Sequence, residues 1–146
     1  MKKKSPRKKV PPQPEVKIDQ RKKDRVAAII AIMVGLLSVR QAGSVLLGVT
    51  TPAYYALPWL LWYTVAMGFI SVIDGIGMWK QREWSITLSM NILLFHGIIF
   101  LGLIGLNQFG QPVSMVSLFG MMITTFSWLV IFSLLKWKRE AKVGND

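Results

Sequence analysis

The chain has 146 residues, of which 52% are hydrophobic and only 17% charged, and its mean hydropathy is +0.42. Average soluble domains carry about 25% charged residues, and most of the charge here lies in one place. Residues 1–25 hold 11 of the 18 Lys and Arg and 3 of the 7 Asp and Glu, which is +8 of the formal +11. The composition excludes an ordinary soluble enzyme, because the long apolar remainder has too few surface groups.

Residues 1–25 form a basic tail that contains Pro11, Pro12 and Pro14 and has no hydrophobic periodicity. Prolines at this density favour an extended chain, so we predict that the tail is disordered. Lys and Arg beside a membrane are attracted to anionic lipid headgroups, by about 1 kcal/mol each. We therefore expect the bilayer, and no nucleic acid, to be the partner of the tail. The expected headgroup contacts are Lys2, Lys3, Lys4, Arg7, Lys8, Lys9, Arg21, Lys22, Lys23 and Arg25.

Four apolar stretches follow, and a spanning helix needs about 20 residues to cross a hydrocarbon core of about 30 Å. The predicted spans are Val26–Val49, Pro58–Met78, Ser85–Leu106 and Met115–Leu135. The first contains Arg40 and Gln41, so a shorter span that ends at Arg40 and continues along the membrane surface is an alternative. The sequence thus predicts an all-α integral membrane protein. Residues 26–135 form a compact four-helix bundle, and residues 136–146 form a short basic C-terminal tail.

The charges of the connecting segments predict the orientation of the chain. Residues 50–56 and 107–114 carry no charge, whereas residues 79–84 and the C-terminal tail carry Lys and Arg. Because basic residues gather on the cytoplasmic side, we predict a multi-pass protein of the cytoplasmic membrane with both termini cytoplasmic. Aromatic residues, which prefer headgroup depth, lie where the span ends are expected. Tyr54, Tyr55, Trp59, Trp62 and Tyr63 are predicted outside, and Trp79, Trp84 and Trp137 inside.

Small residues recur at helical spacing and predict the faces on which the spans pack, because they let helices approach closely in lipid. These faces are Ala28, Ala31, Gly35, Ser38 and Ala42 in the first span, Thr64, Gly68, Ser71 and Gly75 in the second, and Ser117, Gly120 and Thr124 in the fourth. The third span has two partial faces, one with Ser85, Ser89, Ile92, His96 and Leu103 and one with Asn91, Gly102 and Gly105. The alternative interpretation of these faces is a polar pathway between helices.

Four polar side chains inside the spans are the candidate functional residues: Arg40, Asp74, Asn91 and His96. Insertion of a charged side chain near the bilayer centre costs about 2.5–3.5 kcal/mol of free energy. A structural or functional role is therefore expected for each of these residues. At about 1.5 Å of rise per residue, Arg40 and His96 lie about 21 and 16 Å from the cytoplasmic ends of their spans. Asp74 and Asn91 lie only about 6 and 9 Å from theirs. An ion pair between Arg40 and Asp74 is therefore not expected, whereas the basic loop is within reach of Asp74.

Each ionisable residue has a structural explanation and a functional one. We interpret Asp74 as a carboxylate satisfied by neighbours or water, and His96 as a neutral residue hydrogen-bonded between helices. Proton transfer is the alternative for both. Arg40 lies roughly opposite the small face of its span. It either snorkels outward or pairs with an anionic headgroup or with an acidic residue of a partner protein.

The sequence offers little for catalysis. The absence of cysteine excludes disulfides, iron–sulfur clusters, thiolate zinc sites and c-type haem. His96 is the only histidine, and there is no visible nucleophile–base pair or carboxylate dyad. We therefore predict no enzymatic activity, no catalytic residue, no metal site and no cofactor. The segment from Asp74 to Trp84 is similar to turns in small bacterial four-span proteins such as the DoxX-like family, but no residue role transfers from it.

Three functions remain. The first is an accessory, assembly or structural subunit that docks to a larger membrane complex or to itself. The second is a small transporter or channel that uses the four polar residues. It is less favoured because Asn91 and His96 point about 140° apart at about 100° per residue, and because the spans lack the paired interruptions of transporters. The third, a quinone-linked redox protein, depends on His96 alone.

Overall fold

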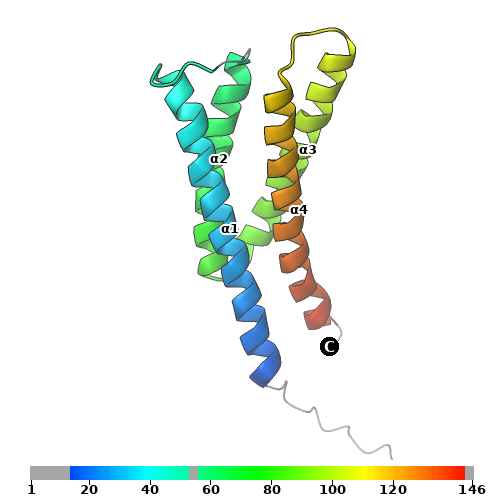
Figure 1. Cartoon of the computed structure of the whole chain (residues 1–146). Helices are drawn as coiled ribbons and strands as arrows, with labels where there is room; N and C mark the ends of the chain where they lie inside the picture. Colours follow the sequence, from blue (N-terminus) through cyan, green and yellow to red (C-terminus); the bar gives the residue numbers. More distant parts are fainter. Residues whose placement is uncertain (1–13, 53–55, 144–146) are drawn as a thin grey trace, which may run out of the picture.

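The computed structural model describes residues 14–52 and 56–143, with side chains for residues 21–52 and 56–135. It contains α1 (Pro14–Leu46), α2 (Pro58–Trp79), α3 (Trp84–Gln108) and α4 (Met115–Val143) (Figure 1). All four helices contain a stretch that is long and apolar enough to cross a membrane. The prediction is therefore confirmed for the helical fold of the described residues and for four helices of suitable length and hydropathy.

The first helix differs most from the prediction. α1 begins at Pro14 and continues without a break through Arg40 to Leu46. Proline suits the first position of a helix, because its φ is already helical and its missing N–H has no partner there. The prediction of disorder therefore does not hold for residues 14–25, and the helix does not end at Arg40. The first basic cluster, Lys2–Lys9, lies outside the described residues.

The other helices begin and end close to the predicted positions. Proline again occupies the first position of α2, and the apolar part of α4 is Met115–Leu135, although the helix continues to Val143. A tight turn joins α2 to α3. In this turn Gln81 adopts a φ of 56°, and the Arg82 N–H donates to the Gly77 carbonyl at 2.9 Å. This turn makes α2 and α3 antiparallel neighbours.

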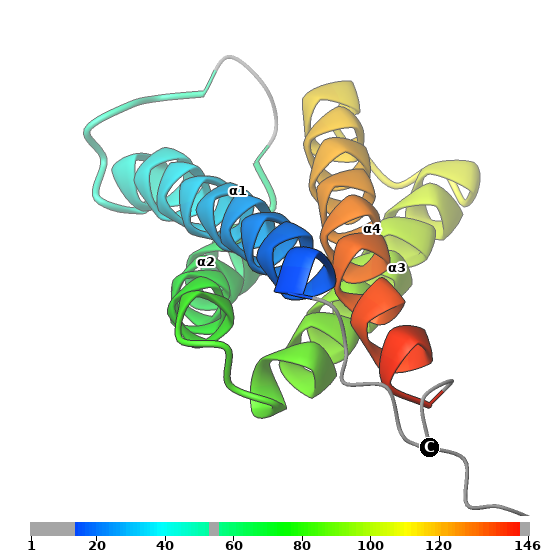
Figure 2. The same ribbon diagram turned by 90° about the horizontal axis from the view of Figure 1, so that it is seen from below.

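The helices form two hairpins that meet at one end. α1 packs along α2 and α3 packs along α4, and the two hairpins separate toward the connections at residues 47–57 and 109–114 (Figure 1). From below, the helices form a ring in which α1 also contacts α4 and α2 also contacts α3 (Figure 2). The arrangement is V-shaped, and it does not confirm the compact four-helix bundle that the sequence predicted.

The small faces of α1 and α2 meet in a close helix–helix seam. A β-carbon on Gly35 would lie 2.6 Å from the Gly68 carbonyl oxygen, and one on Gly75 would lie 3.0 Å from the Ala28 carbonyl oxygen. Both distances are shorter than ordinary van der Waals contact, so glycine is needed at these two positions. Small residues of this kind let helices pack closely within lipid. There the hydrophobic effect does not drive helices together, so their association depends on this close packing.

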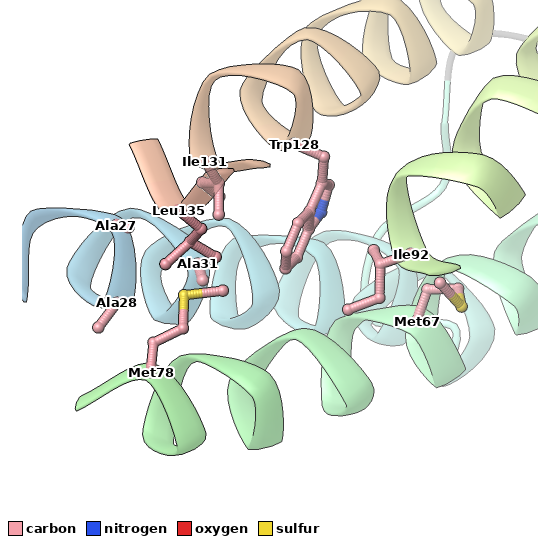
Figure 3. Close-up of a cluster of buried hydrophobic side chains, with 9 residues drawn as sticks. All are labelled: Ala27, Ala28, Ala31, Met67, Met78, Ile92, Trp128, Ile131 and Leu135. Carbon is pink, nitrogen blue, oxygen red and sulfur yellow. The ribbon is translucent and has the colours of Figure 1, made fainter. Parts of the chain in front are cut away.

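The main core lies where the two hairpins meet. Trp128 of α4 is fully buried there, and its ring points between the helices (Figure 3). All four helices contribute to this core, which consists of Ala27, Ala28, Ala31, Met67, Met78, Ile92, Trp128, Ile131 and Leu135. A smaller cluster, Leu60, Leu103 and Met121, joins α2, α3 and α4 nearer the open end.

Candidate functional site

The four polar residues predicted as functional do not come together. Arg40 of α1 and Asn91 of α3 are exposed on the outside of the helices. Asp74 and His96, in contrast, are buried, with 0% and 4% of their surface exposed. Each of these two makes a side-chain contact between α2 and α3, at positions separated by about 10 Å along α3. The structure therefore contains two separate polar contacts in place of one polar pathway.

Asp74 is held by a serine of the neighbouring helix. Ser89 Oγ lies 2.7 Å from Asp74 Oδ2 and also 2.7 Å from the Ser85 carbonyl oxygen. The other carboxyl oxygen, Asp74 Oδ1, is buried and has no hydrogen-bond partner within the described residues. The basic side chains of the turn, Lys80 and Arg82, are exposed. We expected neighbours or water to satisfy the Asp74 carboxyl group. Within the described residues a neighbour does so at Oδ2 but not at Oδ1.

His96 is turned toward its own helix and toward Tyr63. Its Nδ1 lies 2.9 Å from the Ile92 carbonyl oxygen and 3.4 Å from the Tyr63 hydroxyl. Because a carbonyl only accepts, Nδ1 carries a proton and donates it to Ile92. The two rings pack at a centroid distance of 5.6 Å. Tyr63 was predicted at the membrane interface, but it is half-buried in this contact.

Arg40 lies on the outer surface of α1, as its position opposite the small face implied. It is six residues before the end of α1 at Leu46, which places its Cα about 9 Å from that end. A long arginine side chain spans most of such a distance by snorkelling. Because α1 ends at Leu46, before the predicted span end at Val49, Arg40 lies closer to the end of its helix than the sequence predicted.

The basic end of α1 is partly attached to α2. Arg25 is exposed, and its guanidinium lies 5.7 Å from the centre of the Trp79 ring, within the range of a cation–π interaction. Arg21 and Lys22 are exposed as well, and Lys23 is half-buried. Among the predicted interfacial aromatic residues, Trp59, Trp62, Trp79 and Trp84 are exposed, whereas Tyr54, Tyr55 and the Trp137 side chain lie outside the described residues.

A cleft that the sequence did not reveal opens between the first hairpin and α4. Its volume is about 290 Å³, and it lies in the half of the molecule where the hairpins separate. The buried side chains of Leu60 and Met121 line it. The other walls are formed by α1 between Val34 and Val45, the start of α2, and α4 between Val116 and Ser127.

The small face of α4 forms one wall of this cleft. Ser117, Gly120 and Thr124 line it, and a β-carbon on Gly120 would have no atom within 4 Å. Two hydroxyls of the wall donate within α4, from Thr124 to the Gly120 carbonyl and from Ser127 to the Ile123 carbonyl, both at 2.8 Å. Because these two hydroxyls already donate within α4, the wall would favour the close approach of another helix more than hydrogen bonds to it. The small-residue spacing was the signal for this face, but only the structure shows that none of the four described helices covers it.

Comparison with known proteins gives no further assignment. No protein-family model, curated protein or solved structure matches this chain. Within the described residues, no group of three His, Asp or Glu side chains is placed to hold a metal ion. The functional argument therefore depends on the cleft and on the buried polar contacts.

Proposed function

We propose that this small multi-pass membrane protein is a non-enzymatic accessory subunit that docks to a transmembrane helix of a larger membrane protein. The observation that carries the proposal is the cleft between the first hairpin and α4. One wall is the small face of α4 around Gly120, which has open space beside it. Small faces of this kind let a second helix approach closely in lipid.

The chain already uses its other small faces in this way. The faces of α1 and α2 close on each other at Gly35, Gly68 and Gly75, whereas the face of α4 lines the cleft. A helix from another protein would meet walls from α1, α2 and α4 at once. Its side chains would fill a space that is otherwise open to lipid.

Transport has less support from the same geometry. A transport path needs polar groups that line one route, but Arg40 and Asn91 face outward on different helices. Asp74 and His96 form separate contacts with Ser89 and Tyr63. A redox role would depend on His96 alone, whose Nδ1 is already hydrogen-bonded to the Ile92 carbonyl.

Single-cysteine variants test the docking proposal. The natural chain has no cysteine, so a thiol reagent would label this chain only at the introduced position. Gly120→Cys places a thiol in the cleft, and Gly102→Cys places one on the outside of α3. A β-carbon has no atom within 4 Å at either position, so both variants should fold. With a thiol-attached photo-crosslinker in native membranes, Gly120→Cys is expected to crosslink to one larger membrane protein, and Gly102→Cys is not.

The size of the crosslinked product distinguishes the possible occupants. A product of twice the 16.5 kDa chain mass would mean self-association and would contradict the larger partner. A product formed only with lipid, or equal products from both positions, would contradict docking at the cleft.

We further propose that both termini are cytoplasmic and that the basic residues near them face anionic headgroups of the cytoplasmic membrane. The positive charges at the turn between α2 and α3 and at both chain ends support this orientation. Reporter fusions should therefore read external at Gly110, in the turn between α3 and α4, and cytoplasmic at Asp146. The opposite reading at either position would contradict the proposed topology.

A further inference from the structure

The Ser89 hydroxyl oxygen is close to two other oxygens, one of Asp74 and one of Ser85, but the hydroxyl has only one proton to place between them. Ser89 Oγ lies 2.7 Å from Asp74 Oδ2 and 2.7 Å from the Ser85 carbonyl oxygen. A serine hydroxyl has one proton to donate, and the Ser85 carbonyl can only accept. If both close contacts are hydrogen bonds, a second proton must lie between Ser89 and Asp74, and only the carboxyl group can supply it.

The surroundings of Asp74 agree with a neutral group. Its side chain is fully buried, and Oδ1 has no hydrogen-bond donor within the described residues. The core that adjoins it is apolar on α1 and α4, where Ala28, Ala31 and Trp128 lie inside. An ionised carboxylate accepts several hydrogen bonds in water, and this site provides one serine.

Among the side chains that the structure describes, the charged groups at the start of α1 and in the turn lie toward the same end of the helices as Asp74. On α1, Asp24 is buried but has interactions of its own, and Arg25 lies over the Trp79 ring. In the turn, Lys80 and Arg82 are exposed. On α3, Ser89 contacts Asp74, and the buried residues of α3 and α4 in the main core are Ile92, Trp128, Ile131 and Leu135, none of which carries a charge.

We propose that Asp74 is an intramembrane proton-binding site. It carries its proton as a neutral carboxylic acid and donates it from Oδ2 to Ser89 Oγ, while Ser89 donates its own proton to the Ser85 carbonyl. When the proton leaves, the Ser89 proton turns from Ser85 to the carboxylate, so the hydrogen bond between the two hairpins reverses its direction. The next polar group toward the turn is the Ser85 hydroxyl, which donates to the Arg82 carbonyl at 2.7 Å.

Infrared spectroscopy of the full chain in phospholipid vesicles tests this assignment. Every acidic residue other than Asp74 lies in the basic tail, the turn, the first turns of α1 or the C-terminal end. A carboxylic-acid C=O band should therefore be present at neutral pH, shift in D₂O, and disappear in Asp74→Asn. Asp24→Asn, which removes the other carboxyl that is buried among the described side chains, is the matched control and should retain the whole band.

Two further variants keep the proposal testable if a substitution affects folding. Asp74→Asn places an amide N–H where the acid O–H would be, so it should retain the melting temperature of the natural chain, whereas Asp74→Leu should lower it. Ser89→Ala should retain the acid band, because the acid does not depend on a proton from Ser89. No acid band in the natural chain at neutral pH, loss of the band in Asp24→Asn, or a band that appears only in Ser89→Ala would each overturn the proposal.

Discussion

Trp128→Ala is expected to lower the free energy of unfolding by about 3 kcal/mol. The Trp128 side chain is fully buried, and its ring lies among residues of all four helices where the hairpins meet (Figure 3). Truncation of a buried tryptophan costs about 3–5 kcal/mol in water-soluble proteins. The lower end applies here, because lipid is as apolar as the core and most of the loss is packing. Equilibrium unfolding in mixed detergent micelles measures the change.

Two other tryptophan substitutions make this prediction specific. Trp62→Ala removes a side chain that is 65% exposed, so it should change the free energy of unfolding by less than about 0.5 kcal/mol. Trp128→Phe should cost less than Trp128→Ala, because it keeps an aromatic ring and removes an Nε1–H that has no partner within the described residues. Equal effects of Trp62→Ala and Trp128→Ala would contradict the assigned core.

Gly35→Ala is expected to destabilise the protein by about 2 kcal/mol, within the range for overpacking. The new β-carbon would lie 2.6 Å from the Gly68 carbonyl oxygen, and a backbone atom of a packed helix cannot move aside as a flexible side chain would. The intrinsic preference of helices for alanine over glycine, about 1 kcal/mol, opposes this loss only in part. The α1–α2 seam should loosen, which unfolding in detergent would detect as a lower melting temperature.

Gly97→Ala is the matched control for this effect. Gly97 lies within α3, and a β-carbon there would have no atom within 4 Å. The same substitution should therefore stabilise the protein by up to about 1 kcal/mol. The two variants are expected to differ in sign, and stabilisation by both would mean that α1 and α2 do not pack through Gly35.

The sequence predicted the four spans because their hydropathy and length leave little choice, and the spans of α2 and α3 agree with the structure to within two residues at each end. The start of α1 was missed because a run of Lys, Arg and Pro was interpreted as extended chain. Lys and Arg are good helix formers, and an apolar helix that continues beyond Val26 can extend through them. The loss of periodicity at Val26 marks the end of the apolar stretch, but the helix itself continues, and Asp24 within it is still buried.

The contacts of the candidate residues were only partly accessible from the sequence. Asp74 and Ser89 lie five residues from the ends of their helices at Trp79 and Trp84, so counting back from the tight turn would have paired them. The contact between Tyr63 and His96 has no such symmetry, because the two helices diverge. The role of Trp128 was hidden, because tryptophan in a membrane protein also occurs at interfaces, and only the packing of α4 against the first hairpin distinguishes the two.

The length of α1 determines which of its positive charges can interact with a membrane surface. A helix of 33 residues is about 50 Å long, whereas the hydrocarbon core is about 30 Å thick. In the proposed topology part of α1 would therefore lie beyond the hydrocarbon, and Pro14 is about 17 Å further along the helix than Arg25. At physiological ionic strength the Debye length is about 8 Å, so a charge near Pro14 is about two screening lengths further than Arg25 from a membrane surface that Arg25 contacts. Residues 14–20 carry Glu15, Lys17 and Asp19, a net charge of −1, whereas residues 21–25 carry a net charge of +3. In the proposed orientation the far end of the helix therefore acts as a spacer, and the attraction to anionic headgroups is concentrated in the charges near Trp79.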